Sequence, residues 1–311
     1  MAFTITGFLL LAAGGVIMVI AAAEYSRLVE YYKQEIYESL DPRFSIIRIL
    51  LYLFIFGFAA GAVNCILRKV DLFFVFAALV YFLGAGFIFF TLRIQAGAAV
   101  MLREKTLEAI RAFVKTIDLK EFYTKNHSRE VYDIVCLFFD QLVDYRHVLN
   151  RAKLLDAAIL HDIGKINISA ELLSKRDELS PEEWEIIKSH PRRGKEMLEE
   201  TWFREIGDWV KYHHERVDGN GYYGLVSEMI PLESKIIAIA DTYAALCSDR
   251  AYRSRVSHEE AIEVITREAG KHFDRKLVEC FRRIDRNALD RRETPQAAGK
   301  GFFFKKRVKI P

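Results

Sequence analysis

The sequence predicts an all-α protein with three N-terminal transmembrane helices followed by a bundle of shorter helices. Residues 1–93 are dominated by apolar and aromatic runs, whereas the rest of the 311-residue chain is rich in charge and helical periodicity. No stretch of the charged part has the sustained strand alternation, bounded by turn residues, that indicates a sheet. We therefore expect a membrane domain over 1–93, a connector helix over 94–120, a helical domain over 121–290 and a basic tail over 291–311.

Three apolar segments are long enough to cross a bilayer, which takes about 20 helical residues. They cover residues 3–23, 49–67 and 72–92, and the third contains no charge. A helix buried in a soluble core would be shorter and would have a polar face. The first segment could instead be a cleaved signal peptide, because residues 21–23 are all Ala, but no basic residue precedes Arg27. We expect three uncleaved spans in contact with the lipid bilayer.

The basic residues predict the orientation of these spans, because Lys and Arg are enriched in cytoplasmic loops. Arg27, Lys33, Arg43 and Arg48 lie in the 24–48 loop, and Arg93, Arg103, Lys105 and Arg111 follow the third span. Only Arg68 and Lys69 lie in the short hairpin between the second and third spans. We expect a multi-pass protein of a bacterial-type cytoplasmic (inner) membrane, with its N-terminus outside and its C-terminal half in the cytoplasm.

The connector over 94–120 has one apolar stripe at helical spacing, formed by Val100, Leu107, Ile110, Val114 and Ile117. Such a stripe suits two arrangements. It could pair with the same helix of a second copy in a homodimer, or it could pack on the helical domain of its own chain. The sequence does not decide between them.

Composition gives no support to two further classes of protein. A net charge of +3 gives no reason to expect nucleic-acid binding. The four cysteines are widely spaced and form no CxxC pair, so we expect reduced thiols rather than a disulfide framework.

The helical domain has two clear helix starts, at residues 180–183 and 257–260, where Ser precedes a Glu three positions later.

Five of the eight histidines form a suggestive set: His127, His161, His190, His213 and His214. His161 is followed by Asp162, and His213 and His214 are adjacent. Burying so many polar groups is unfavourable unless each finds a partner, and imidazoles with carboxylates suit iron, manganese, nickel or zinc. Pro191 disfavours a helical conformation at His190, so we expect His190 at a helix junction, in the N-cap position, facing a site.

These motifs resemble the HD-GYP family, a branch of the HD phosphohydrolase superfamily. The resemblance covers residues 107–285 and is carried, in order, by segments 123–128, 161–165 (His-Asp-Ile-Gly-Lys), 189–191, 213–222, 230–232, 239–243, 248–253 and 270–274. It implies a helical bundle around a metal centre that hydrolyses cyclic di-GMP to the linear dinucleotide and/or GMP. The metal ligands it implies are His127, His161, Asp162, His190, His213, His214 and Asp241.

The resemblance also implies individual roles. Asp162 would bridge two divalent metals, iron or manganese first and nickel or zinc next. A third metal is not expected, because Tyr123 stands where members with three metals have Glu. Lys165 would act beside Asp162 in catalysis by stabilising phosphoryl charge. Substrate binding would involve Arg250, Arg253, Asp218, Gly219, Gly221 and Tyr222.

The sequence departs from the family pattern at several positions. Tyr223 stands where the family has the Pro of Gly-Tyr-Pro, Ala244 replaces an Asp, and Arg275 replaces a Pro. None of these is an implied metal ligand, but they leave the substrate open. The leading hypothesis is a membrane-bound cyclic di-GMP phosphodiesterase. The alternatives are an HD phosphohydrolase acting on another nucleotide, and a catalytically silent signalling module that binds a nucleotide or a partner.

Overall fold

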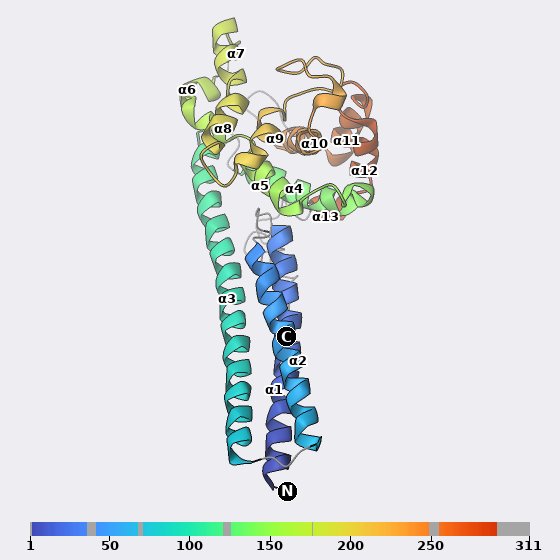
Figure 1. The fold of residues 1–311 in the computed structure, drawn as a ribbon. Helices are drawn as coiled ribbons and strands as arrows, with labels where there is room; N and C mark the ends of the chain where they lie inside the picture. Colours follow the sequence, from blue (N-terminus) through green and yellow to red (C-terminus); the bar gives the residue numbers. More distant parts are fainter. Residues whose placement is uncertain are drawn as a thin grey trace. The chain divides into compact units, whose positions relative to one another are not determined.

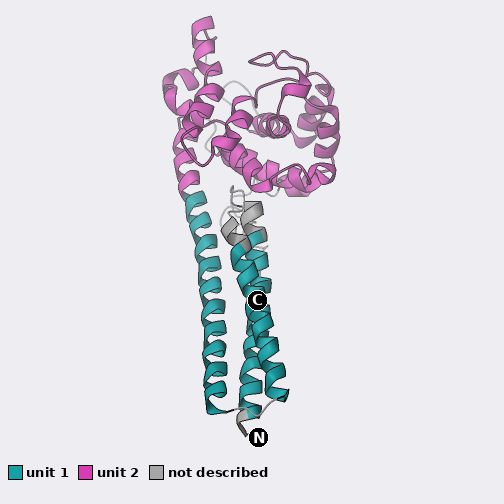
Figure 2. Cartoon of the chain, in the orientation of Figure 1, with its two compact units in different colours: residues 1–108 teal, residues 109–311 magenta. Residues whose placement is uncertain are grey.

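The computed structural model describes residues 2–35, 42–67, 71–120, 126–175, 177–248 and 255–290. Regular structure within these ranges is helical, apart from two isolated bridges, Asp218–Val226 and Ala269–Phe273. The all-α prediction is therefore confirmed for the described residues. The chain divides into two compact units, Met1–Glu108 and Ala109–Pro311 (Figure 2), which are described separately below.

The first unit consists of long apolar helices. They are α1 (Ala2–Glu35), α2 (Pro42–Leu67) and the greater part of α3 (Leu72–Asp118) (Figure 1). Within them, Thr4–Val29, Ile46–Leu67 and Leu72–Asp118 each contain a strongly apolar stretch of 18 residues with at most two charged side chains. All three helices are long and apolar enough to cross a membrane, as the sequence predicts.

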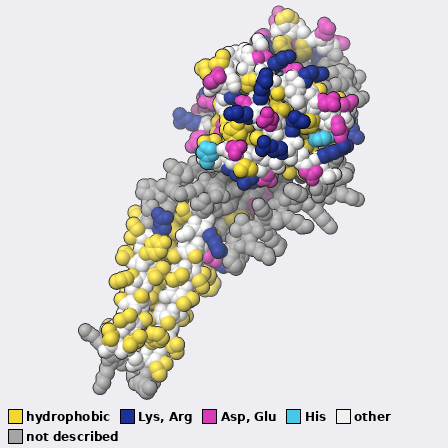
Figure 3. Space-filling model, turned by 90° about the vertical axis from the view of Figure 1, so that its right-hand side faces the viewer, with side chains coloured by type: hydrophobic (Ala, Val, Ile, Leu, Met, Phe, Trp, Pro, Cys, Tyr) yellow, Lys and Arg dark blue, Asp and Glu magenta, His cyan; other side chains and the backbone are white. Residues whose placement is uncertain are grey.

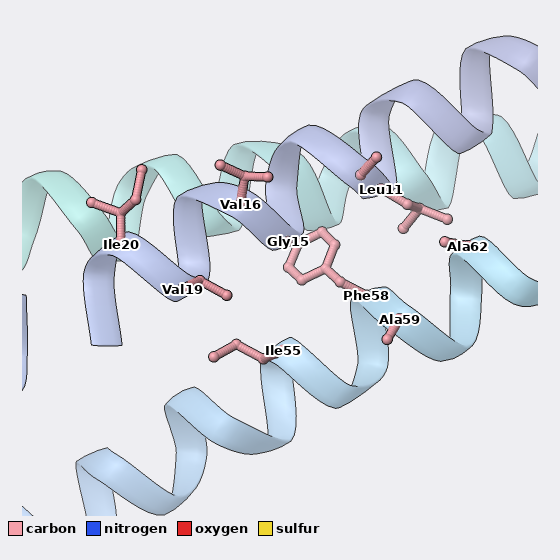
Figure 4. A pocket seen from close by; sticks show the side chains of 10 residues that line it. Leu11, Gly15, Val16, Val19, Ile20, Ile55, Phe58, Ala59 and Ala62 are labelled. Carbon is pink, nitrogen blue, oxygen red and sulfur yellow. The ribbon is translucent and has the colours of Figure 1, made fainter. Parts of the chain in front are cut away.

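Packing in the first unit centres on an aromatic side chain of α2, Phe58. Phe58 is 2% exposed and meets Tyr81 of α3 edge-on, with ring centroids 5.8 Å apart. Beside it, α1 and α2 enclose an open apolar groove whose lining includes Leu11, Val16 and Phe58 (Figure 4). An ion pair between Glu24 and Arg93, 2.9 Å apart, joins α1 to α3.

The outer surface of these helices is also apolar. Phe56, Phe73 and Phe87 are each more than 70% exposed, and hydrophobic side chains cover most of the described part of this unit on the face seen in Figure 3. Water-facing surfaces rarely carry such large contiguous apolar areas. A lipid environment is the natural match for this surface.

The second unit is a bundle of short helices. It contains α4 (His127–Gln141), α5 (Arg151–Leu160), α6 (Ala170–Leu173), α7 (Pro181–Lys188), α8 (His190–Leu198), α9 (Gly207–Lys211), α10 (Leu232–Cys247), α11 (His258–Arg267), α12 (Arg275–Phe281) and α13 (Arg286–Asp290). Short 3₁₀ helices occur at η1 (Val143–Tyr145), η2 (Ile163–Asn167), η3 (Arg204–Ile206) and η4 (Ser227–Met229). Both predicted helix starts are confirmed as complete capping boxes, at Ser180 with Glu183 and at Ser257 with Glu260.

The core of the second unit lies among α4, α5, α10 and α12. Its fully buried side chains include Phe138 on α4, Leu154 on α5, Ile236 on α10 and Phe281 on α12. The rings of Phe138 and Phe281 meet edge-on with centroids 4.9 Å apart, a favoured aromatic geometry. This packing fixes the helix ends that carry the polar cluster described next.

The predicted connector continues the third apolar helix without a break to Asp118. Val114 and Ile117, at the end of the predicted apolar stripe, are 4% and 3% exposed. Arg111 lies over the ring of Tyr132 on α4, 5.6 Å from its centroid. The last turns of α3 therefore pack within the helical domain; the predicted homodimer remains a prediction.

Candidate metal centre

The seven predicted ligands are brought together, mainly by the ends of helices. His127 is the first residue of α4, His161 and Asp162 directly follow α5, His190 begins α8, His213 and His214 follow α9, and Asp241 lies within α10. His190 is at a helix junction as expected, but the N-cap position belongs to Ser189. Pro191 is accommodated in the first turn of α8, where a missing N–H costs nothing.

Ligand atoms gather in two groups. One consists of Asp162, His190, His213 and His214, and the other of His127, His161 and Asp241. Within each group the donor atoms lie within 4.8 Å of one another. All seven residues are buried or half-buried, so both groups are shielded from bulk water.

Asp162 faces both groups at once. Its Oδ1 lies 3.1 Å from Nε2 of His190 and 4.0 Å from Nε2 of His213. Its Oδ2 lies 3.3 Å from Nε2 of His161 and 4.0 Å from Nε2 of His127. One carboxylate therefore presents one oxygen to each group, which is the arrangement of a bridging ligand. Asp241 completes the second group, with Oδ1 2.9 Å from Nε2 of His127.

Helix-end carbonyls fix the orientation of three imidazoles. Each donates from Nδ1 to the carbonyl oxygen three residues earlier: His161 to Ala158 at 2.8 Å, His190 to Ile187 at 2.7 Å and His213 to Val210 at 2.6 Å. These carbonyls lie in the last turns of helices, where acceptors lack intrahelical partners. In a neutral, metal-binding imidazole, an Nδ1–H bond of this kind leaves Nε2 unprotonated and directs its lone pair into the cluster.

The buried ring nitrogens fit a metal. Among the described residues, Nε2 of His161, His190 and His213 and Nδ1 of His127 are buried without a hydrogen-bond partner. Leaving several polar atoms unsatisfied in one place is costly. Neutral imidazole nitrogens and carboxylate oxygens are ligands of iron, manganese, nickel and zinc. A metal would satisfy the three Nε2 atoms, which face Asp162, so the residues present fit the cofactor that the sequence predicts.

The charges of the metal-free cluster are strongly coupled. Burial favours neutral His161, but the Asp162 and Asp241 carboxylates outweigh it and raise its pKa to about 9. Burial and the neighbouring imidazoles lower the pKa of His213 to about 3. Burial alone would raise the pKa of Asp162, but Lys165 and His161 hold it well below its usual value. Burial would also raise the pKa of Asp241, but its bond with His127 holds it below its usual value, so both carboxylates stay ionised in a buried site, where they attract cations.

Lys165 is placed beside the bridging carboxylate. It lies on η2, and its Nζ is 2.7 Å from Oδ2 of Asp162. The preceding Gly164 allows η2 to approach α8 closely: a Cβ there would overlap the carbonyl oxygen of His190 and lie 2.6 Å from the amide nitrogen of Gly194. Gly164 thereby sets the spacing between Asp162 and His190.

The predicted substrate-binding loop is partly structural. Asp218 is paired with Arg216 at 2.8 Å and accepts from the backbone N–H of Asn220, and Gly219 has a φ of +78° that favours glycine. Tyr222 is the predicted loop residue that reaches the cluster, with its ring centroid 4.7 Å from that of His214. Burial raises the pKa of Tyr222 to about 12, so its hydroxyl stays protonated.

Three residues that the sequence analysis linked to the metal and substrate site fall outside the described part of the chain. They are Arg250, Arg253 and Tyr123. Phosphate binding by the two arginines, and the absence of a third metal argued from Tyr123, therefore stay predictions.

Among the buried carboxylates that sequence reasoning missed, two lie next to predicted ligands or their helices. Glu215 is 3% exposed, and its two oxygens accept from the backbone N–H groups of Tyr223 and Leu225, each at 2.6 Å. An acidic residue directly after two ligand histidines was the available signal. Asp118, the last residue of α3, is 6% exposed and bonds Ser128. No local pattern links two residues ten positions apart.

The fold and the cluster define a helical metal-binding domain, and comparison with known proteins identifies its family. The HD domain family model matches residues 112–277. This match covers more than half of the chain, and the chain belongs to the HD domain family.

Several curated proteins are similar to the chain. A probable cyclic di-GMP phosphodiesterase of Vibrio cholerae is 31% identical over 212 residues, which are 63% of this chain and 47% of that protein. A cyclic di-GMP phosphodiesterase of Thermotoga maritima is 39% identical over 138 residues, 43% of this chain and 38% of that protein. A 3'3'-cGAMP-specific phosphodiesterase of V. cholerae is 33% identical over 189 residues, 60% of this chain and 40% of that protein. The chain spans less than half the length of each of these relatives.

Proposed function

We propose that this protein is a membrane-anchored, metal-dependent phosphodiesterase that hydrolyses a cyclic dinucleotide. Cyclic di-GMP is the first candidate substrate, with the linear dinucleotide and/or GMP as product. The observation that carries the proposal is the position of Asp162, which presents one carboxylate oxygen to each of two ligand groups while Lys165 lies 2.7 Å away. Relatives with phosphodiesterase names support the same reaction class.

The cofactor in this proposal is a pair of divalent ions, one for each ligand group. Iron or manganese is preferred, and nickel or zinc suits the same ligands. When bound, such ions supply an activated water nucleophile near neutral pH and neutralise charge on the phosphoryl group. His127, His161, His190, His213, His214, Asp162 and Asp241 would hold them.

The chain's own residues would bind and orient the phosphodiester. Lys165 brings a positive charge beside Asp162, where it can stabilise the negative charge that develops on phosphoryl oxygens. Tyr222 remains protonated and covers His214. Arg250 and Arg253 are proposed to hold the outer phosphates, a role that suits the guanidinium fork.

An aromatic surface beside the cluster supports a nucleotide substrate. Trp184 of α7 is 43% exposed, and its ring centroid lies 6.3 Å from that of Tyr222. Exposed aromatic rings stack on nucleobases, which contributes about 1–3 kcal/mol per base. A phosphodiester held at the ligand groups would have its base within reach of these rings.

A second candidate is an HD phosphohydrolase acting on another cyclic dinucleotide. A relative named for 3'3'-cGAMP is 33% identical to this chain, and Tyr223 alters the loop beside Tyr222. A catalytically silent module is disfavoured, because every predicted ligand residue is present and gathered at one site.

For the anchor, we propose three membrane spans in the cytoplasmic (inner) membrane. The apolar helices and their exposed Phe side chains suit lipid. The distribution of Lys and Arg supports an N-terminus outside and a catalytic domain in the cytoplasm, where nucleotides are available.

The test is hydrolysis by the full chain, purified in detergent and loaded with Mn²⁺ or Fe²⁺. Cyclic di-GMP and 3'3'-cGAMP are supplied separately, and products are separated by chromatography. We expect turnover of cyclic di-GMP and its loss in both His161→Ala and Asp162→Ala. Turnover of 3'3'-cGAMP alone would favour the second candidate, and retained turnover in the two variants would refute the assignment of the site.

A further inference from the structure

The start of α4 is capped from a different helix. The first N–H groups of a helix have no intrahelical acceptor and usually receive a side chain from the N-cap residue. The N-cap residue of α4, Asn126, makes no such bond. Instead Asp118, at the end of α3, accepts from the backbone N–H of Ser128 at 3.3 Å and from its hydroxyl at 2.7 Å. A carboxylate in this position also interacts favourably with the helix dipole.

This cap lies beside His127, a predicted metal ligand whose ring is oriented differently from those of the other ligand histidines. His161, His190 and His213 are each oriented by a carbonyl of their own segment. His127, next to Ser128, has no partner at Nδ1 and contacts Asp241 through Nε2. Its position therefore depends on where α4 begins.

A second contact connects the end of α3 with the same centre. Lys120 donates from Nζ to the carbonyl oxygens of Ile166 at 2.6 Å and Ile168 at 3.4 Å. Ile166 belongs to η2, the turn that carries Lys165. The residues that end the connector thus bond to the segments of both His127 and Lys165.

We propose that Asp118 is a positioning residue for the metal centre. By capping α4 it fixes His127, and so it sets the metal affinity of the group formed by His127, His161 and Asp241. The proposal rests on the metal centre of the proposed function. Helix α3 runs unbroken from Leu72 to Asp118. A displacement of its last turn would therefore be passed to His127 through the hydrogen bonds between Asp118 and Ser128.

The experiment measures Mn²⁺ binding to the metal-stripped full chain in detergent, with no substrate present. We expect Asp118→Ala to weaken binding about 10- to 100-fold, the usual effect of removing a residue that orients a ligand. Ser128→Ala should weaken it less, since its backbone N–H still reaches Asp118. Thr116→Ala is the matched control: its side chain is exposed on the same turn and bonds Phe113 of its own helix, so parental affinity is expected.

Unchanged Mn²⁺ affinity in Asp118→Ala, with only a lower melting temperature, would overturn the proposal by showing a purely structural role. If Asp118→Ala does not fold, Mn²⁺ affinity is measured for Asp118→Asn and Ser128→Ala instead, and unchanged affinity in both overturns the proposal. A parent chain that binds no Mn²⁺ also overturns it. A parent that binds Mn²⁺ without hydrolysing cyclic dinucleotides leaves the positioning role supported and refutes only the proposed reaction.

Discussion

Replacing Gly164 by Ala should disable the metal centre without adding or removing any polar group. A Cβ at this position would overlap the carbonyl oxygen of His190 and lie 2.6 Å from the amide nitrogen of Gly194. These are backbone atoms, so no side chain can rotate away. Since carbon contacts are favourable at about 3.5–4.0 Å, η2 and α8 would have to separate by about 1.5 Å to clear the carbonyl oxygen of His190.

That separation acts directly on the site. It would pull Asp162 from His190, whose ligand atoms are now 3.1 Å apart. A misplacement of about 1 Å can cost about 10²-fold in rate, and overpacking costs about 1–3 kcal/mol in stability. We therefore expect Gly164→Ala to lose about two orders of magnitude in kcat, with weaker metal binding.

The matched control for this change is Gly207→Ala. Its Cβ would lie 3.2 Å from Cγ of Lys195, a flexible side chain that can move aside, and Ala is favoured over Gly in a helix by about 0.5–1 kcal/mol. Metal content, initial rates and thermal melting are compared for both variants. Parental rate and metal content in Gly164→Ala would refute the spacing argument.

Three further changes test other parts of the site. Tyr223→Pro removes the N–H that donates to the buried Glu215, so we expect the free energy of unfolding to fall by about 1–3 kcal/mol. Tyr223→Ala keeps this N–H and is the control. An equal fall in both variants would contradict the role of the hydrogen bond. Lys165→Met should lower kcat by at least tenfold with metal content unchanged; an equal kcat would exclude Lys165 from the reaction. In the metal-stripped chain, the raised pKa of His161, about 9, gives a stabilisation that is complete below its unfolded value near 6.5 and lost as pH rises through 9. The melting temperature of the metal-stripped parent, minus that of His161→Gln, should fall over that pH range. A difference that does not change with pH would contradict the interaction of His161 with the Asp162 and Asp241 carboxylates.

Local signals indicated part of the ligand set, and the resemblance to the HD-GYP family supplied the rest, including Asp241. His161 with Asp162 and the adjacent His213 and His214 are unusual pairs in any helical sequence, and each falls at a helix end where it can face a shared centre. The apolar spans and the two capping boxes are equally local. The structure bears out the all-α fold and brings the predicted metal ligands together.

Other features depend on tertiary contacts that spacing does not reveal. Asp118 caps a helix that begins nine residues later, so the bond to Ser128 follows from how two helices meet. Tyr223 reads in the sequence as a departure from a Pro, but in the structure its N–H is a donor to Glu215 that Pro could not supply. The second carboxylate oxygen of Glu215 bonds Leu225, which explains why a buried acid follows the two histidines.

Metal stoichiometry tests the central claim most directly. The full chain, purified in detergent and loaded with Mn²⁺ or Fe²⁺, is analysed by mass spectrometry for moles of metal per chain, beside Asp162→Ala. The account predicts two ions per parent chain, one for each ligand group, and loss of metal when the bridging carboxylate is removed. One ion or none in the parent, or two ions retained in Asp162→Ala, would contradict it.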